Sequence, residues 1–135
     1  MTLDEAGCWV RLESARHGVL GTAHARRGVD AVPVVFAIAG GRLIVPVDTI
    51  KAKRARPLQR LRNLERDSRC VLLVDEYDDD WSRLWWVRVH GQGVETAPTA
   101  EMVDLLAERY PQYRLGGSVT AVVVVSPSEI TGWTA

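Results

Sequence analysis

The chain alternates between segments whose apolar positions have helical spacing and segments with strand-like spacing. Over residues 2–15 apolar side chains recur every three or four positions, and Thr2 and Glu5 have the spacing of a capping box, which predicts an N-terminal helix. The Gly40-Gly41 pair predicts a tight hairpin turn. Short apolar segments bounded by turn residues predict strands at 17–23, 31–39 and 42–47.

The second half of the chain continues this mixed pattern. Pro57 is expected at the first position of a helix that ends near Arg66, because proline is favoured at that position. Thr99 is expected to cap a further helix over 100–110, whose apolar residues bury one side. The remaining apolar segments predict strands at 69–77, 82–97 and 118–126.

The order of these elements favours antiparallel pairing. Strands joined by short turns pair antiparallel, whereas parallel strands need a long crossover connection. Pro33 and Pro46 must lie at an edge, a bulge or a barrel seam, because proline lacks a ladder donor. The run "AVVVV" at 121–125 does not alternate, which indicates a strand covered on both faces. We therefore expect one domain over 1–135, with a mainly β (α+β) fold: a small antiparallel β-barrel with peripheral helices.

Composition narrows the class of protein. The chain has 135 residues, of which 47% are hydrophobic and 25% charged, and this is enough for one buried core. Its formal net charge of zero argues against a dedicated nucleic-acid binder. Cys8 and Cys70 lack C-x-x-C spacing and are typical of reduced thiols. No export signal or bilayer-length apolar run is visible, so we expect a cytoplasmic protein without a membrane partner.

Motifs for catalysis by the protein's own groups are missing from the sequence. His17, His24 and His90 have no metal-ligand spacing with each other or with the cysteines, so no metal is expected. No nucleophile motif and no dinucleotide-binding glycine motif occurs, and no catalytic residue is nominated. If the protein is an enzyme, its cofactor must therefore supply the reactivity.

Positive charge gathers in the stretch 51–69, which holds eight cations against two anions. Its first cations precede the predicted helix start, where backbone N–H groups and the helix dipole favour a phosphate or a chain of carboxylates. Arg60 and Asn63 could extend the same face of the helix, whereas Arg62 and Arg66 are expected on a solvated face. The cations before the helix are Lys51, Lys53, Arg54 and Arg56.

Two interpretations of this basic stretch remain open. The first is an anion-binding site, favoured because the cations cluster at one helix start. The second is a charged surface helix paired with the acidic loop "DEYDDD" at 75–80.

The segment "DDDWSRLWWVRVHG" at 78–91 contains three of the five tryptophans. Its alternation as a strand divides it into an apolar face and a face that combines an aromatic ring with cationic side chains. The second face suits a ring-bearing ligand or a subunit interface, and simple packing is the alternative. The apolar face holds Trp85, Val87 and Val89, and the other holds Trp86, Arg88 and His90.

The chain resembles the pyridoxamine-phosphate-oxidase-like split β-barrel proteins. It is similar, more narrowly, to the actinobacterial branch of deazaflavin (coenzyme F420)-dependent oxidoreductases. The most specific segments are "KAK" before "RLRNLERDSR" and "DDDWSRLWWVRVHG", and the resemblance covers nearly the whole chain. It implies an FMN-binding or PNPOx-like fold, a homodimer with cofactor sites at the subunit interface, and hydride transfer to a small unsaturated organic substrate.

The resemblance also implies cofactor-binding residues. The ring is expected beside barrel strands, its phosphate and acidic tail in the basic loop, and the tryptophan segment is expected to approach from the other subunit. Relatives often have a Ser or Thr in this loop, where this chain has "KAKRA". The implied residues are Pro33, Val34, Val35, Val47, Asp48, Lys51, Lys53, Arg54, Arg60, Trp81, Trp86 and Arg88.

The charge of the basic stretch bears on the choice of cofactor. One or two cations satisfy the single phosphate of FMN, whereas the F420 tail of several carboxylates suits a wider cationic strip. F420 is therefore the first choice, and FMN in the same fold is the alternative. A protein that binds F420 without catalysis is a third possibility, and a nucleic-acid binder is disfavoured because the strip lacks interleaved aromatic residues.

Overall fold

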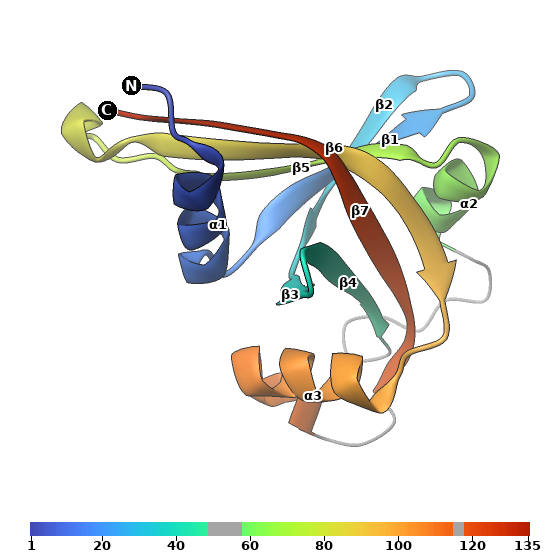
Figure 1. Cartoon of the computed structure of the whole chain (residues 1–135). Coiled ribbons are helices and arrows are strands. Elements are labelled where there is room, and N and C mark those ends of the chain that lie inside the picture. Colours follow the sequence, from blue (N-terminus) through green and yellow to red (C-terminus); the bar gives the residue numbers. More distant parts are fainter. Residues whose placement is uncertain (49–57, 115–117) are drawn as a thin grey trace.

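Seven strands form one antiparallel sheet in the computed structural model, which describes residues 1–48, 58–114 and 118–135 (Figure 1). The spatial order is β2-β1-β5-β6-β7-β4-β3, and every neighbouring pair is antiparallel. This confirms the predicted antiparallel fold with peripheral helices. The strands are β1 (Gly18–His24), β2 (Gly28–Val34), β3 (Ala37–Ala39), β4 (Arg42–Asp48), β5 (Arg69–Glu76), β6 (Trp85–Thr96) and β7 (Val119–Thr134).

The three α-helices among the described residues lie at the periphery of the sheet (Figure 1). The first begins later than predicted: the carboxylate of Asp4 accepts the Gly7 N–H at 2.7 Å, while Thr2 pairs with Trp133. Thr99 caps the third helix as predicted, and its hydroxyl accepts the Met102 N–H at 3.2 Å. The helices are α1 (Glu5–Ser14), α2 (Gln59–Arg66) and α3 (Ala100–Arg109), with 3-10 turns at Trp81–Arg83 and Pro111–Arg114. Pro57, predicted to begin α2, lies outside the described residues.

Strand boundaries differ from the prediction in several places, three of which have a clear cause. The expected strand 31–39 is divided into β2 and β3, because the peptide groups of Phe36 bond to Tyr110 instead of to a neighbouring strand. β6 begins only at Trp85, since the preceding 3-10 turn is closed by Asp80, whose carboxylate accepts the Ser82 N–H at 3.0 Å. β7 extends to Thr134, well past the predicted end, because β6 pairs with it along its whole length.

The two strand prolines lie where no ladder donor is needed. Pro33 is on β2, which is an edge strand and pairs only with β1. Pro46 pairs with Val122 of β7, but on its other side β4 pairs with β3 only over 42–44. Both prolines therefore lie beside an open sheet edge, as predicted.

β7 separates two buried clusters. Val123 and Val125 belong to the larger cluster inside the sheet, which also takes residues from α1, α2 and the inner sides of the strands. Val122 belongs to a second cluster beneath α3, and Val124 packs against that cluster. The non-alternating valine run is therefore covered on both faces, as predicted. None of the described helices is long and apolar enough to cross a membrane.

Candidate functional site

Two segments carry the residues expected beside the cofactor ring, one before β3 and one in β4. β3 pairs with β4 over Ala37–Ala39, so residues 33–35 precede this pairing and residues 45–47 of β4 extend past its Ala37–Ile44 end. Val34 is buried in the core, so only its backbone is available to a ligand. Pro33 is exposed, and Val35 and Val47 are half-buried. Asp48 is the last residue of β4, and its side chain is outside the described part of the structure.

A tyrosine from the end of α3 holds this region in place. The Tyr110 hydroxyl accepts the Phe36 N–H at 3.2 Å, and its oxygen lies 2.9 Å from the Phe36 carbonyl oxygen and 3.0 Å from that of Arg16. Arg109 lies over the Phe36 ring, 5.0 Å from its centroid, and donates to backbone carbonyls at the end of α1, among them Glu13 at 2.8 Å. The segment next to the expected ring site is therefore tied to two helices.

Trp86 and Arg88 project from the outer side of β6. Their side chains stack, with the guanidinium carbon 5.1 Å from the ring centroid, a distance typical of a cation–π contact. The opposite side of β6 is core: Val87 and Val89 are completely buried, and Trp85 is nearly so. The division of β6 into two faces is thus confirmed, and Trp86 lies in a cross-strand row between Asp75 and Trp133.

Pro33 and Arg88 lie in the same row of the sheet but not side by side. The register runs from Pro33 to Val19, from Val19 to Leu73, and from Leu73 to Arg88. Three strand-to-strand steps of about 4.8 Å separate the two residues by roughly 14 Å. Within one protomer, two strands therefore lie between Pro33 and Arg88. The two groups of predicted residues form two separate places on one chain.

An apolar surface lies between these two places. Val29 and Val71 lie over Gly21, where an added Cβ would meet the Val71 Cγ1 at 2.9 Å and the Val29 Cγ1 at 3.6 Å. Val29 is 69% and Leu73 39% exposed. The described helices pack against the core on the other side of these strands, so no described element covers this surface. We call it the open sheet face; its residues are Val19, Gly21, Val29, Ala31, Pro33, Val71 and Leu73.

α2 contributes the described part of the basic stretch. Arg60 is half-buried, and Asn63 is only 2% exposed, with its amide donating to the Thr22 hydroxyl at 3.0 Å and to Asp30 at 2.9 Å. Asn63 therefore anchors the helix to the first hairpin instead of facing a ligand. The prediction that places a phosphate at Lys51, Lys53 and Arg54 concerns residues outside the described part of the structure.

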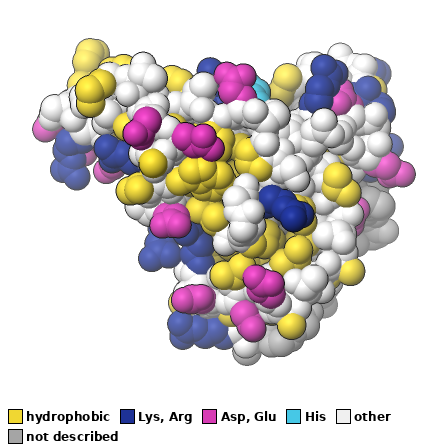
Figure 2. All heavy atoms as spheres, viewed as in Figure 1, with side chains coloured by type: hydrophobic (Ala, Val, Ile, Leu, Met, Phe, Trp, Pro, Cys, Tyr) yellow, Lys and Arg dark blue, Asp and Glu magenta, His cyan; other side chains and the backbone are white. Residues whose placement is uncertain are grey.

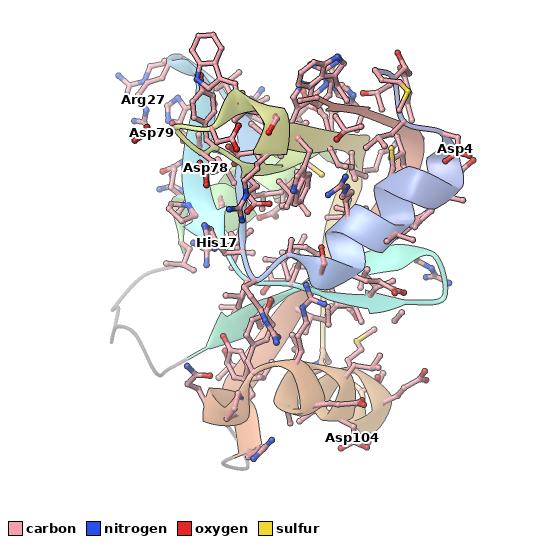
Figure 3. The ribbon with its side chains drawn as sticks, turned by 90° about the vertical axis from the view of Figure 1, so that its left-hand side faces the viewer. Asp4, His17, Arg27, Asp78, Asp79 and Asp104 are labelled. Atoms are coloured by element: carbon pink, nitrogen blue, oxygen red, sulfur yellow. The ribbon has the colours of Figure 1, made fainter. Side chains whose placement is uncertain are left out.

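The acidic loop at 75–80 does not neutralise α2. It forms the end of the β5–β6 hairpin, which lies at the opposite end of the molecule from α2 (Figure 1). Its ion pairs among the described residues are with Arg83, at 3.9 Å from Glu76 and 3.8 Å from Asp78. Figure 3 shows Asp78 and Asp79 at this hairpin end, and Trp81, 68% exposed, follows them. The interpretation of a basic helix paired with this loop is therefore wrong for α2.

The described thiols are buried and offer no reactive group. Burial raises the pKa of Cys70 to about 11, and burial followed by the nearby Asp4 and Glu5 raises the pKa of Cys8. Both cysteines are free. Within residues 1–48, 58–114 and 118–135 no three His, Cys, Asp or Glu side chains gather as metal ligands would.

The sequence did not reveal the roles of Arg109 and Tyr110, which hold the segment around Phe36 in place. The prediction placed both at the end of a helix over 100–110 and assigned no contact to either. The sequence did contain a hint of this role. A tyrosine and an arginine at the end of a helix can each hydrogen-bond to several backbone carbonyls. What could not be read was which carbonyls the fold brings there, namely those of Phe36 and of the end of α1.

Comparison with solved structures supports the fold over almost the entire chain. A FAD-binding protein from Mesorhizobium loti is 17% identical, with a TM-score of 0.75 over 98% of this chain and 95% of that chain. A conserved hypothetical protein from Mycobacterium tuberculosis is 19% identical, with a TM-score of 0.77 over 98% and 85%. A FAD-binding protein from Mycobacterium smegmatis is 18% identical, with a TM-score of 0.68 over 100% and 99%.

No curated protein matches this sequence. The sequence itself, however, matches a family description across residues 4–134, from the cap of α1 to the end of β7. The match includes the open sheet face, the Trp86–Arg88 pair and the basic stretch. This chain therefore belongs to the Pyridoxamine 5'-phosphate oxidase family.

Proposed function

We propose that the protein is a cytoplasmic oxidoreductase that uses coenzyme F420 to reduce a small unsaturated organic molecule. Family membership supports a flavin-type cofactor, and the free, buried cysteines suit a reducing compartment. The observation that carries the choice of F420 is the charge of α2. Arg60, Arg62 and Arg66 follow four further cations in the sequence and are not neutralised by the acidic loop, so a cofactor with several carboxylates fits better than one with a single phosphate.

The residues at the proposed ring site fit a flat heterocycle. Pro33 and the half-buried Val35 and Val47 supply apolar surface beside an open strand edge. Arg60 on α2, with Lys51, Lys53 and Arg54 before it, would hold the phosphate and the first tail carboxylates. The reduced deazaflavin, when bound, supplies a hydride. The protein's apolar side chains would position the substrate and exclude water, and solvent would provide the proton that completes the reduction.

We further propose that two copies of this chain pair through the open sheet face. The apolar residues of that face are uncovered in one chain, and two strands lie between Pro33 and Arg88 within a protomer. In a two-fold pair, Trp81, Trp86 and Arg88 of one copy would complete the ring site of the other. FMN, a flavin with a single tail phosphate, remains the second candidate cofactor. FAD is a third candidate, because two structural neighbours are FAD-binding proteins.

A titration followed by tryptophan fluorescence tests the choice of cofactor. F420, FMN and FAD would be added in parallel to the purified protein. We expect saturable quenching by F420 that salt weakens, and at most weak quenching by the flavins. Tighter binding of FMN or FAD would replace F420 by a flavin. Binding of F420 without oxidation of its reduced form by any of a panel of enones and nitroaromatics would favour a protein that only carries the cofactor.

A further inference from the structure

A second cationic site lies away from the proposed ring site. The turn between β1 and β2 meets the exposed face of α2 at an open pocket of about 350 Å³. This volume lies within the range of small-molecule sites. Arg62 and Arg66, expected on a merely solvated helix face, line this pocket together with Arg26 and Arg27 from the turn. Figure 2 shows Lys and Arg side chains gathered at this end of the hairpin.

The charges of this pocket are largely unbalanced. Of its four arginines only Arg27 forms an ion pair among the described residues, with Asp30 at 2.9 Å. No carboxylate lines the pocket itself. The nearest acidic residue after α2, Asp67, is held by Arg69 at 2.7 Å. Arg26 and Arg62 therefore line a shared space without an ion pair in the described part of the chain, whereas the charge of Arg66 also interacts with the nearby Asp67. A bound anion would reduce the repulsion among these exposed guanidinium groups.

Hydrogen bonds hold the walls of the pocket in position. The Nδ1 atom of His24 accepts the backbone N–H groups of Arg26 and Arg27, each at 3.0 Å, and so fixes the turn. Arg66 donates to the Ala23 carbonyl at 2.9 Å and joins α2 to β1. Asn63, buried beneath the pocket, donates to Thr22 and Asp30. Because both walls are tied to the same strand, an anion would not have to order them on binding.

The labelled Arg27 shows how the turn presents its charge. Figure 3 shows its side chain at the end of the β1–β2 hairpin, directed away from the sheet. Its bidentate contact with Asp30, at 3.0 and 2.9 Å, closes the hairpin side of the pocket. The guanidinium groups of Arg26 and Arg62 form no hydrogen bond or ion pair within the described part of the chain and are therefore the two available for a ligand.

We infer that this pocket binds a small organic anion with at least two anionic oxygen groups, phosphate or carboxylate. Guanidinium groups match both through bidentate, charge-assisted hydrogen bonds. Two sources could present this chemistry: the outer carboxylates of a bound F420 tail, or a separate small anion. The anion site stands on the pocket alone, and only its assignment to the tail rests on the proposed function.

Amide NMR of the Lys51→Ala/Lys53→Ala protein, titrated with inorganic pyrophosphate at low ionic strength, tests the site apart from the basic loop. We expect saturable shifts of the Arg26, Arg27 and Gly28 amides. Adding Arg26→Ala and Arg62→Ala should weaken the apparent affinity about tenfold, as expected for the loss of charge-assisted hydrogen bonds. A matched pair, Arg42→Ala and Arg114→Ala, removes the same charge elsewhere and should leave the affinity unchanged. Equal weakening by both pairs, or no saturable shifts at the turn, would overturn the site.

A second arm distinguishes the two sources in the wild-type protein. F420 with a long glutamate tail would be compared with the same deazaflavin carrying a single glutamate. If the tail occupies the pocket, the long tail binds more tightly, and Arg26→Ala/Arg62→Ala abolishes that difference. If a separate anion occupies it, tail length has no effect and pyrophosphate still shifts the turn in the presence of saturating F420. Failure of all F420 binding with retained pyrophosphate shifts would reject the proposed function and leave the anion site intact.

Discussion

The Tyr110 hydroxyl accepts the Phe36 N–H at 3.2 Å, across 74 residues of sequence. Tyr110 is 8% exposed and Phe36 is completely buried, so this bond lies in a region where an unpaired N–H is costly. It divides what would otherwise be one strand into β2 and β3. It also fixes the segment that the cofactor ring is proposed to touch.

Tyr110→Phe should destabilise the protein and weaken cofactor binding together. Loss of the hydroxyl leaves the Phe36 N–H unpaired, at a cost of about 1–3 kcal/mol in the free energy of unfolding. Urea unfolding and fluorescence titration measure the two effects. Tyr77→Phe is the matched control, because Tyr77 is 76% exposed, and should change stability by less than about 0.5 kcal/mol. Equal stability of the two variants would show that the Tyr110 bond contributes nothing.

Gly91→Ala should be among the most damaging single-methyl changes in the sheet. A Cβ at Gly91 would collide with the Ser126 backbone, meeting its carbonyl carbon at 3.0 Å and the Pro127 Cα at 3.2 Å. Backbone cannot rotate away, and the register already shifts at this point between β6 and β7. We expect a loss of about 1–3 kcal/mol by thermal or urea unfolding. Gln92→Ala, at the exposed neighbouring position, serves as the control. Unchanged stability of the Gly91→Ala protein would mean that the two strands can separate here at little cost.

Val19→Glu should convert the proposed dimer to monomer. Val19 lies in the middle of the open sheet face, opposite Pro33 and Leu73, and a carboxylate there would be buried without a partner in a pair of copies. Val10→Glu places the same charge on the exposed side of α1 and should leave the assembly unchanged, since Val10 is 65% exposed on another surface. Analytical ultracentrifugation separates the outcomes. A wild-type monomer at all concentrations would reject the paired arrangement outright.

The first hairpin should lose a stabilising contact in acid. The pKa of Asp30 lies below its ordinary value of 3.8, chiefly because its carboxylate accepts a hydrogen bond from Arg27 and, second, because it accepts one from Asn63. A carboxyl with a lowered pKa stabilises the folded state fully above its ordinary value and loses this contribution as pH falls through the folded value. The stability difference between wild type and Asp30→Asn should therefore be largest at neutral pH and shrink below about pH 4. Thermal unfolding across that range measures it, and a constant difference would show that Asp30 acts without its charge.

Neither cysteine should react in the folded protein. Cys70 is buried and its pKa is raised to about 11, so little thiolate exists at pH values near 8. Cys8 is completely buried against β7. An Ellman titration at mild alkaline pH should detect almost no thiol in the native protein and both thiols in urea. Rapid native labelling would mean that the sheet or α1 opens readily.

Much of this architecture follows from local rules. Alternation, glycine pairs and capping residues placed most of the elements, including the Thr99 cap and the two faces of β6, because these depend on neighbours within a few residues. The strand prolines could be assigned to open edges because one missing donor limits where they can lie. The family followed from longer motifs in the same chain.

Tertiary structure alone decided how distant residues meet. The Phe36 break, the extension of β7 to Thr134 and the burial of Asn63 each depend on a partner far along the chain, which no local period encodes. The basic helix was visible as charge, but only the fold brought Arg62 and Arg66 beside Arg26 and Arg27, and the acidic loop to the opposite end. The sequence determines which groups carry charge and which sides of an element are apolar. Which other groups each charge interacts with depends on distances, and these distances are set only when the strands pair.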